Sequence, residues 1–218
     1  NVNEAPVITS GFTGTVAENA ATSTVIYTVT STDVDASATV IYSIKPGLSD
    51  DAGLVSINAA TGEVSVADTG LIDYESDQSL DIEVTATSDD GTSTTQVYTV
   101  NVLDFDEFDI TQVTDSDTND NEVSEAALAG TVVGVTAFAE DADLSDNVTY
   151  AITDDPSGAF EIDADSGIVT LAATGVLDYE TVTEVDLEIT ATSDDGSSST
   201  EIFTINILDA NEAGVGSI

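Results

Sequence analysis

Residues 72–91 read IDYESDQSLDIEVTATSDDG, and residues 177–196 read LDYETVTEVDLEITATSDDG. The two stretches are separated by 177 − 72 = 105 residues. The same offset relates residues 102–104 (VLD) to residues 207–209 (ILD). One offset over this much sequence indicates two copies of a domain of about a hundred residues. We therefore predict two tandem domains, residues 1–105 and residues 106–218.

Apolar and polar residues alternate inside the repeated stretch. Leu80, Ile82, Val84 and Ala86 fall on one face of an extended segment, and the residues between them are polar or acidic. This period of two is typical of a half-buried β-strand, and no part of the chain has a convincing helical period. Further strands are expected at residues 25–30, 40–44, 55–57, 63–66, 98–102, 131–137, 148–152, 160–162, 168–171 and 203–207. The pattern predicts an all-β fold: two Greek-key β-sandwich domains of about seven strands each.

The charge of the chain restricts its partners. There are 43 Asp and Glu residues against one basic residue, Lys45, and the net charge is −42. The repulsion between these charges destabilises the compact state of the chain. High salt or bound divalent cations reduce this repulsion. Most of these acids are expected on a solvated surface. A basic protein surface would be attracted and nucleic acid would be repelled.

Residue types that are missing narrow the chemistry. The chain has no Cys and no His, so disulfides and thiolate or imidazole metal ligands are excluded, while ligation by oxygen remains available. Without these residues, and with one basic side chain, we expect no enzyme activity. No apolar run reaches membrane-spanning length, and no signal peptide is present, so membrane insertion is not expected. Because the chain starts and stops inside the repeat pattern, we expect it to come from a longer array.

Pairs of carboxylates recur in register. If the segment is extended, Asp73 and Glu75 point to the same side, and two such acids repel each other unless a cation lies between them. The spacing recurs at residues 178 and 180, 33 and 35, 141 and 143, and 104 and 106. Calcium takes six to eight oxygen ligands, so several pairs meeting at a domain junction would complete its shell. The pattern therefore predicts calcium binding.

Taken together, these motifs resemble the cadherin repeat. The matching motifs are Val16-Ala17-Glu18-Asn19, Asp33-Val34-Asp35, Asp73-Tyr74-Glu75 and the acidic linker Asp104-Phe105-Asp106-Glu107, with second copies at residues 123–126, 141–143 and 178–180. The variant resembles the bacterial cadherin-like tandem repeats of large secreted, RTX-type adhesins, although it has no RTX nonapeptide.

The resemblance implies calcium ions at the domain junction. The ligands that it implies are Glu18, Asp73, Glu75, Asp104, Phe105, Asp106, Glu107, Phe108, Asp141, Asp143 and Asp195, with main-chain carbonyls at the two phenylalanines. Asp194 is an alternative to Asp195 because that loop is shorter than the family norm. Glu107 stands where the family has Asp, and Asp106 where it has Asn. Other acids would face absent neighbours and bind weakly: Asp33, Asp35, Asp90, Glu125, Asp178, Glu180, Asp209 and Glu212.

One acidic stretch has no counterpart in the first copy. Residues 115–121, DSDTNDN, begin like an EF-hand loop, but Asp120 stands where glycine is needed and Ala126 where the bidentate Glu is needed. Either an additional calcium site or a solvated insertion fits this stretch.

The sequence favours a calcium-stiffened extender or adhesion module of an extracellular, cell-surface protein. Its partners would be calcium ions and neighbouring repeats, with a homophilic or a glycan ligand as further options. The alternative is a carbohydrate-binding β-sandwich. Sugar platforms use exposed aromatic rings, and Phe105 and Phe108 in the linker are the candidates.

Overall fold

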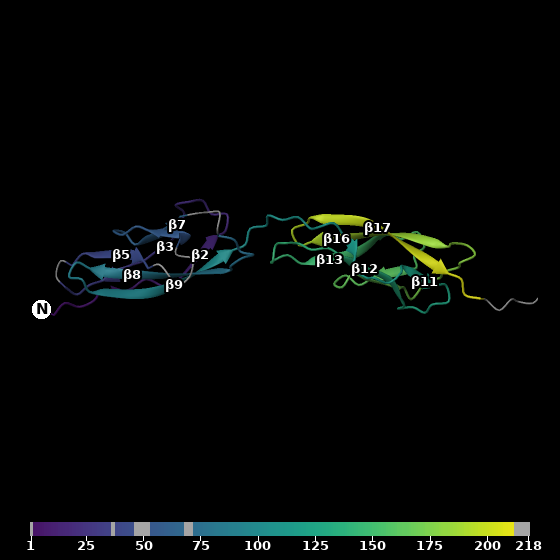
Figure 1. Cartoon of the computed structure of the whole chain (residues 1–218), viewed down its shortest axis with the longest axis horizontal. Coiled ribbons are helices and arrows are strands. Elements are labelled where there is room, and N and C mark those ends of the chain that lie inside the picture. The colour runs from purple at the N-terminus through teal and green to yellow at the C-terminus, as the bar shows by residue number, and fades with distance from the viewer. Residues whose placement is uncertain (1, 36–37, 46–52, 68–71, 212–218) are drawn as a thin grey trace, which may run out of the picture. The chain divides into compact units, whose positions relative to one another are not determined.

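The computed structural model describes residues 2–35, 38–45, 53–67 and 72–211. The chain divides into two compact units, Asn1–Asp106 (unit 1) and Glu107–Ile218 (unit 2). Both units are built from strands, and the described residues form no α-helix. Figure 1 shows the strands of each unit as arrows joined by loops. The predicted all-β class is therefore confirmed.

Unit 1 contains two main sheets. Its strands are β1 (Val7–Ile8), β2 (Thr13–Ala17), β3 (Val25–Thr28), β4 (Ser31–Thr32), β5 (Val40–Ile44), β6 (Val55–Ile57), β7 (Glu63–Val66), β8 (Ser79–Ser88) and β9 (Ser93–Leu103). One sheet has the order β2-β9-β8-β5 and the other β3-β7-β6, while β1 pairs with β4.

Unit 2 repeats this plan. Its strands are β10 (Thr114–Asp115), β11 (Glu122–Ser124), β12 (Val132–Phe138), β13 (Val148–Asp154), β14 (Phe160–Ile162), β15 (Ile168–Leu171), β16 (Glu184–Ser193) and β17 (Ser198–Leu208). The sheets have the orders β11-β17-β16-β13 and β10-β12-β15-β14. The short first strand differs: β10 joins the second sheet, whereas β1 pairs, among the described residues, with β4 alone.

The inner faces of the sheets form a separate core in each unit. Leu80, Ile82, Val84 and Ala86 on β8 are all buried, as the alternation predicts. They pack in unit 1 with residues of both main sheets, including Val64 and residues of β9. The corresponding residues of β16 lie in the core of unit 2. Each buried aliphatic side chain contributes roughly 1.5–3 kcal/mol, so these cores are the main source of stability.

A parallel strand pair sets one end of each unit. β2 runs parallel to β9, with Ala17 in register with Leu103. β11 runs parallel to β17 with Ser124 in register with Leu208. The chain therefore leaves both members of each pair at the same end of the unit. β2 and β11 were not among the expected strands, because each is short and pairs with a segment far away in the sequence.

Two glycines permit a close approach between neighbouring strands of one sheet, at corresponding places in the two units. Gly62 and Gly167 have φ angles of 75° and 70°. A Cβ atom on Gly62 would collide with the carbonyl oxygen of Val29, and one on Gly167 with that of Ala137. Only glycine fits a position that combines positive φ with main-chain contact.

Candidate metal centre

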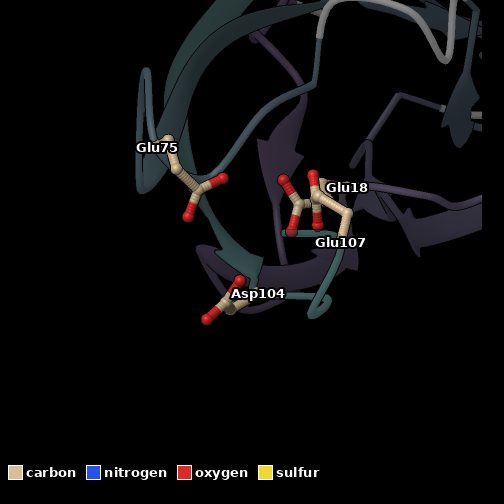
Figure 2. Close-up of side chains that lie close together, drawn as sticks. All are labelled: Glu18, Glu75, Asp104 and Glu107. Atoms are coloured by element: carbon tan, nitrogen blue, oxygen red, sulfur yellow. The ribbon is translucent and has the colours of Figure 1, made fainter. Parts of the chain in front are cut away.

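The parallel strand pair of unit 1 and a turn near it bring together three acids. Glu18 follows β2 directly and Asp104 follows β9, so the register of Ala17 with Leu103 places them side by side. Carboxylate oxygens of Glu18, Glu75 and Asp104 lie within 4.8 Å of one another. Figure 2 shows these three side chains; it also labels Glu107, the first residue of unit 2. The arrangement gathers acids that are far apart in the sequence.

The buried acid of this group is fixed by main-chain amides. Glu18 is 5% exposed. Its Oε2 accepts a hydrogen bond from the N–H of Tyr74 at 2.7 Å, and its Oε1 accepts one from the N–H of Phe105 at 2.6 Å. Hydrogen bonds to an ionised acceptor are short and strong. The carboxylate is therefore held in one orientation from two sides.

The segment that carries Asp73 and Glu75 is a turn, so the expectation of an extended segment is wrong. The carbonyl oxygen of Asp73 accepts from the N–H groups of Ser76 and Asp77 at 3.2 and 2.9 Å. The Asp73 carboxylate accepts from the N–H of Glu75 at 3.1 Å and from the Ser76 hydroxyl at 2.8 Å. An Asp that bonds its own following backbone favours a turn over a strand. Asp73 thus fixes the turn. Glu75 is the residue of this turn whose carboxylate lies with those of Glu18 and Asp104.

Unit 2 has the same constellation at the end of its own parallel pair. Oxygens of Glu125, Glu180 and Asp209 lie within 4.8 Å of one another. Glu125 accepts from the N–H of Tyr179 at 2.6 Å and from the N–H of Ala210 at 2.8 Å. The three acids of each unit therefore occupy corresponding positions.

The turn of unit 2 is also fixed by its aspartate. The hydroxyl of Thr181 donates to Asp178 at 2.8 Å. This hydrogen bond is the main reason that the pKa of the exposed Asp178 carboxyl lies below its usual value. Asp178, like Asp73, thus serves the turn with its carboxylate.

In each unit, an aspartate side chain also binds the main chain of the segment that enters the unit. Asp143 is 1% exposed, and its Oδ2 accepts from the N–H of Phe108 at 2.8 Å. Its Oδ1 lies 3.5 Å from the N–H of Glu107. In unit 1, Asp35 accepts from the N–H of Glu4 at 3.0 Å. The second Asp of each Asp-x-Asp motif therefore binds the main chain of the entering segment.

Within unit 2, Asp195 rather than Asp194 lies with another acid. An oxygen of Asp195 is within 4.8 Å of one of Asp146. The N–H of Asp195 donates to Asp146 Oδ2 at 3.1 Å. Asp194 instead accepts from the side-chain amide of Asn147 at 3.0 Å.

Sequence reasoning missed Asp146 because the first copy offers no repeat of it. The Asp-x-Asp motif of unit 1 precedes that of unit 2 by 108 residues (141 − 33), and residue 146 − 108 = 38 is Ala38. The only signal was its place in the loop after Asp143.

The other predicted ligands have different surroundings. Phe105 and Phe108 are 51% and 45% exposed, and their N–H groups are used by Glu18 and Asp143. Asp106 and Glu107 are exposed and stand on the two sides of the division between the units. In the EF-hand-like stretch, Asp115 accepts from the N–H groups of Asp117 and Thr136 at 3.0 and 3.1 Å. Residues 115–121 belong to none of the carboxylate groups found in the described parts of the chain.

The donor set fits a hard cation. Asp33, Asp104 and Asp141 each have a buried carboxylate oxygen with no hydrogen-bond partner among the described residues. A buried acceptor without a partner is costly, and a metal ion removes that cost. Lys45, the one basic residue, lies 3.1 Å from Glu83. Carboxylate and carbonyl oxygens are the ligands that calcium prefers.

The comparisons identify the relatives of the chain. The model of the Cadherin domain matches residues 12–103 and again residues 119–208. Human Protocadherin Fat 1 is 36% identical over 188 residues, which is 84% of this chain and 4% of that protein. Human Cadherin EGF LAG seven-pass G-type receptor 2 is 33% identical over 199 residues, 89% of this chain and 6% of that protein. The chain thus spans only a few per cent of the length of these relatives.

Solved structures agree with the observed fold. The crystal structure of mouse Cadherin-23 EC22-24 is 26% identical and has a TM-score of 0.68, over 94% of this chain and 65% of that one. A structure of Protocadherin Gamma B2 extracellular cadherin domains 3-6 is 22% identical with a TM-score of 0.75, over 94% and 53%, and this likeness concerns the fold alone. The predicted cadherin-like architecture is confirmed. The relatives named here leave the predicted bacterial adhesin unconfirmed. Separately, the described residues contain no helix long and apolar enough to span a membrane.

Proposed function

Because the chain belongs to the cadherin family, we propose that it is a calcium-binding pair of repeats from an extracellular adhesion-type protein, and that ions at the domain junction stiffen it. The observation that carries this proposal is the carboxylate group formed by Glu18, Glu75 and Asp104, together with its counterpart in unit 2. Like charges gathered in this way repel one another unless a cation offsets them.

The residues that would hold the ions follow from their position. Glu18, Glu75 and Asp104 are the proposed ligands of unit 1, and Asp141, Asp143, Asp146 and Asp195 those of unit 2. A bound calcium would offset the negative charge of these acids, and their oxygens would coordinate it. Asp73 remains a proposed ligand, with its side chain also committed to the turn. The linker acids Asp106 and Glu107 and the main-chain carbonyls of Phe105 and Phe108 complete the proposed set.

The linker is the reason to place the ions at the junction. Asp104, Asp106 and Glu107 lie within a single covalent segment that leaves unit 1 and enters unit 2. An ion held by Asp104 and by either of the next two acids fixes the main-chain torsions between them. Binding to the folded form alone also raises stability by linkage. We therefore propose that calcium changes the linker from a self-repelling segment into a rigid one.

Adhesion and an extracellular, cell-surface location are proposed from the family and from the far longer relatives. A rod of repeats would carry a distal binding domain or meet another rod. The narrower proposal of a bacterial secreted adhesin is supported by the net charge of −42, which suits a salty habitat. A parent protein with RTX nonapeptides after the repeats would support it, and a parent with an animal membrane anchor would refute it.

A catalytic role and a glycan-binding role have less support. The proposed metal binding accounts for the carboxylate groups, and the chain has neither Cys nor His to act as a nucleophile or base. The exposed rings of Phe105 and Phe108 are the remaining argument for a sugar platform. Binding to a glycan array would revive that alternative.

Small-angle scattering with EDTA and then with calcium tests the proposal. We expect calcium to shift the distribution of interatomic distances to longer values and to increase the largest dimension. The Asp104→Ala/Asp106→Ala variant should not respond, whereas the Asp154→Ala/Asp165→Ala variant, which removes the same charge from exposed positions, should respond as the unmodified chain does. An unchanged distribution in the unmodified chain would refute stiffening.

A further inference from the structure

We propose that Glu18 and Glu125 are metal-independent latches: each carboxylate ties a turn to the segment that leaves its unit, before any ion binds. This role concerns the metal-free protein and does not depend on the proposed calcium binding. The contacts that carry it are hydrogen bonds to main-chain amides, which need no metal.

The turn in unit 1 leaves an amide that requires an outside acceptor. Ser76 and Asp77 donate back to the carbonyl of Asp73, and Glu75 donates to its carboxylate. The N–H of Tyr74, at the start of the turn, has no acceptor within it. Such amides resemble those of the first turn of a helix, which need a capping oxygen. Glu18 Oε2 supplies that oxygen across 56 residues of sequence.

The other oxygen of Glu18 fastens the linker. Oε1 accepts from the N–H of Phe105, directly after Asp104. The N–H of Glu18 itself donates to the carbonyl of Leu103 at 3.2 Å, so the contact continues the parallel pairing of β2 with β9 beyond both strands. Phe105 therefore stays fixed to unit 1 through a side chain that is itself buried.

The second copy has the same latch. Glu125 accepts from Tyr179 and Ala210, and its N–H donates to the carbonyl of Leu208 at 3.1 Å. Tyr179 and Ala210 correspond to Tyr74 and Phe105 at the offset of 105 residues (179 − 74 and 210 − 105). The residue at this position is Phe105 in one copy and Ala210 in the other. The side chain can differ because the contact uses only the main-chain N–H.

Latching leaves the acids able to bind a metal. A carboxylate has about four lone-pair sites, and each latch uses two. The latch would hold the turn of Glu75 against the segment of Asp104, so that their carboxylates are already close when calcium arrives. Preorganisation of this kind reduces the ordering that binding must impose.

Hydrogen exchange of the unmodified chain in EDTA gives the first test. We expect the amides of Tyr74, Phe105, Tyr179 and Ala210 to exchange at least about tenfold more slowly than the same amides in an unstructured peptide. Exchange at the unstructured rate at all four amides would overturn the proposal, whether or not calcium binds later. Failure to bind calcium would refute the proposed function and leave the latch intact.

The Glu18→Gln variant gives the second test. An amide can accept only through one oxygen, so Tyr74 or Phe105 loses its acceptor, and exchange of that amide in EDTA should be about tenfold faster. Tyr179 and Ala210 should not change, because they belong to the other latch. Glu63→Gln removes the same charge from an exposed strand position and should leave all four amides unchanged.

The amide of Val84, in the core strand β8, shows whether the variant is folded. Unchanged exchange of Tyr74 and Phe105 in a folded variant would refute the latch. If Glu18→Gln unfolds unit 1, Glu125→Gln is compared at Tyr179 and Ala210 with the same criteria.

Discussion

The buried carboxylate of Asp143 accepts a hydrogen bond from the main-chain N–H of Phe108 at 2.8 Å. The acid is 1% exposed, and the hydrogen bond from this amide offsets part of the cost of burying a carboxylate. One aspartate therefore positions the start of unit 2 and, in our proposal, also binds an ion. A variant of Asp143 can therefore show how much this side chain stabilises unit 2 when no metal is bound.

Asp143→Asn should destabilise unit 2 even in EDTA. The change weakens a charge-assisted bond and places an amide donor opposite the N–H of either Phe108 or Glu107, at a cost of about 1–3 kcal/mol. Urea denaturation in EDTA measures it. Asp165→Asn, on an exposed turn, is the control with the same charge change and should cost nothing measurable. Equal stability of the two variants would contradict the prediction.

Asp146 and Asp194 should differ in their effect on calcium. Asp146→Ala removes a proposed ligand, and we expect calcium at the junction to bind about tenfold more weakly, because affinity follows the number of ligand charges. Asp194→Ala removes the contact with Asn147 and should leave the affinity little changed. Isothermal titration of both variants decides between them. A larger loss of calcium affinity in Asp194→Ala would show that Asp194, the alternative to Asp195, is a ligand.

Tyr27 should make unit 1 sensitive to alkaline pH. Burial is the main cause that raises the pKa of Tyr27, and the neighbouring Tyr98 adds to it. The unfolded chain, with an ordinary tyrosine pKa of about 10, therefore loses this proton first as the pH rises. The contribution to stability is complete below about pH 10 and is lost above it. Denaturation across this range should show a smaller loss of stability in Tyr27→Phe, and an identical pH profile would count against the argument.

Near neutral pH, two tyrosine variants should separate packing from hydrogen bonding. The rings of Tyr27 and Tyr98 stack with their centroids 4.8 Å apart. The hydroxyl of Tyr27 is buried without a partner in the described structure, whereas that of Tyr98 lies 2.8 Å from the hydroxyl of Ser10. Tyr27→Phe should therefore be neutral or slightly stabilising, and Tyr98→Phe should cost about 1 kcal/mol. The opposite order in urea denaturation would mean that the Tyr27 hydroxyl has a bound partner.

Gly62→Ala should be far more harmful than Gly91→Ala. Both glycines have positive φ, 75° and 91°, so alanine is strained at each. Only Gly62 would also bring its Cβ against a main-chain oxygen, while Gly91 has open space. We expect roughly 1 kcal/mol of backbone strain in both variants and a further loss in Gly62→Ala. Thermal denaturation showing equal losses would mean that the β3–β7 contact can relax.

The sequence by itself determined the all-β class, the two copies and the inward faces of the long strands. Alternation is a local property: Leu80, Ile82 and Val84 face one way because successive side chains of a strand point to opposite sides. The repeat offset singled out Asp73, Glu75 and Asp104 as candidates, since both copies keep these acids in order. These features need no knowledge of which strands are neighbours.

Only the tertiary structure decided which acids meet. Glu18 reaches Asp104 because β2 pairs with β9 in parallel, a contact between distant segments that local periodicity does not encode. The Asp73 segment became a turn because side-chain hydrogen bonds of Asp73 compete with extended backbone, and alternation rules ignore that competition. Asp146 lies beside Asp195 through a loop contact that the described residues of unit 1 do not repeat. Position along the chain selected the acids, and strand register and turns placed their oxygens together.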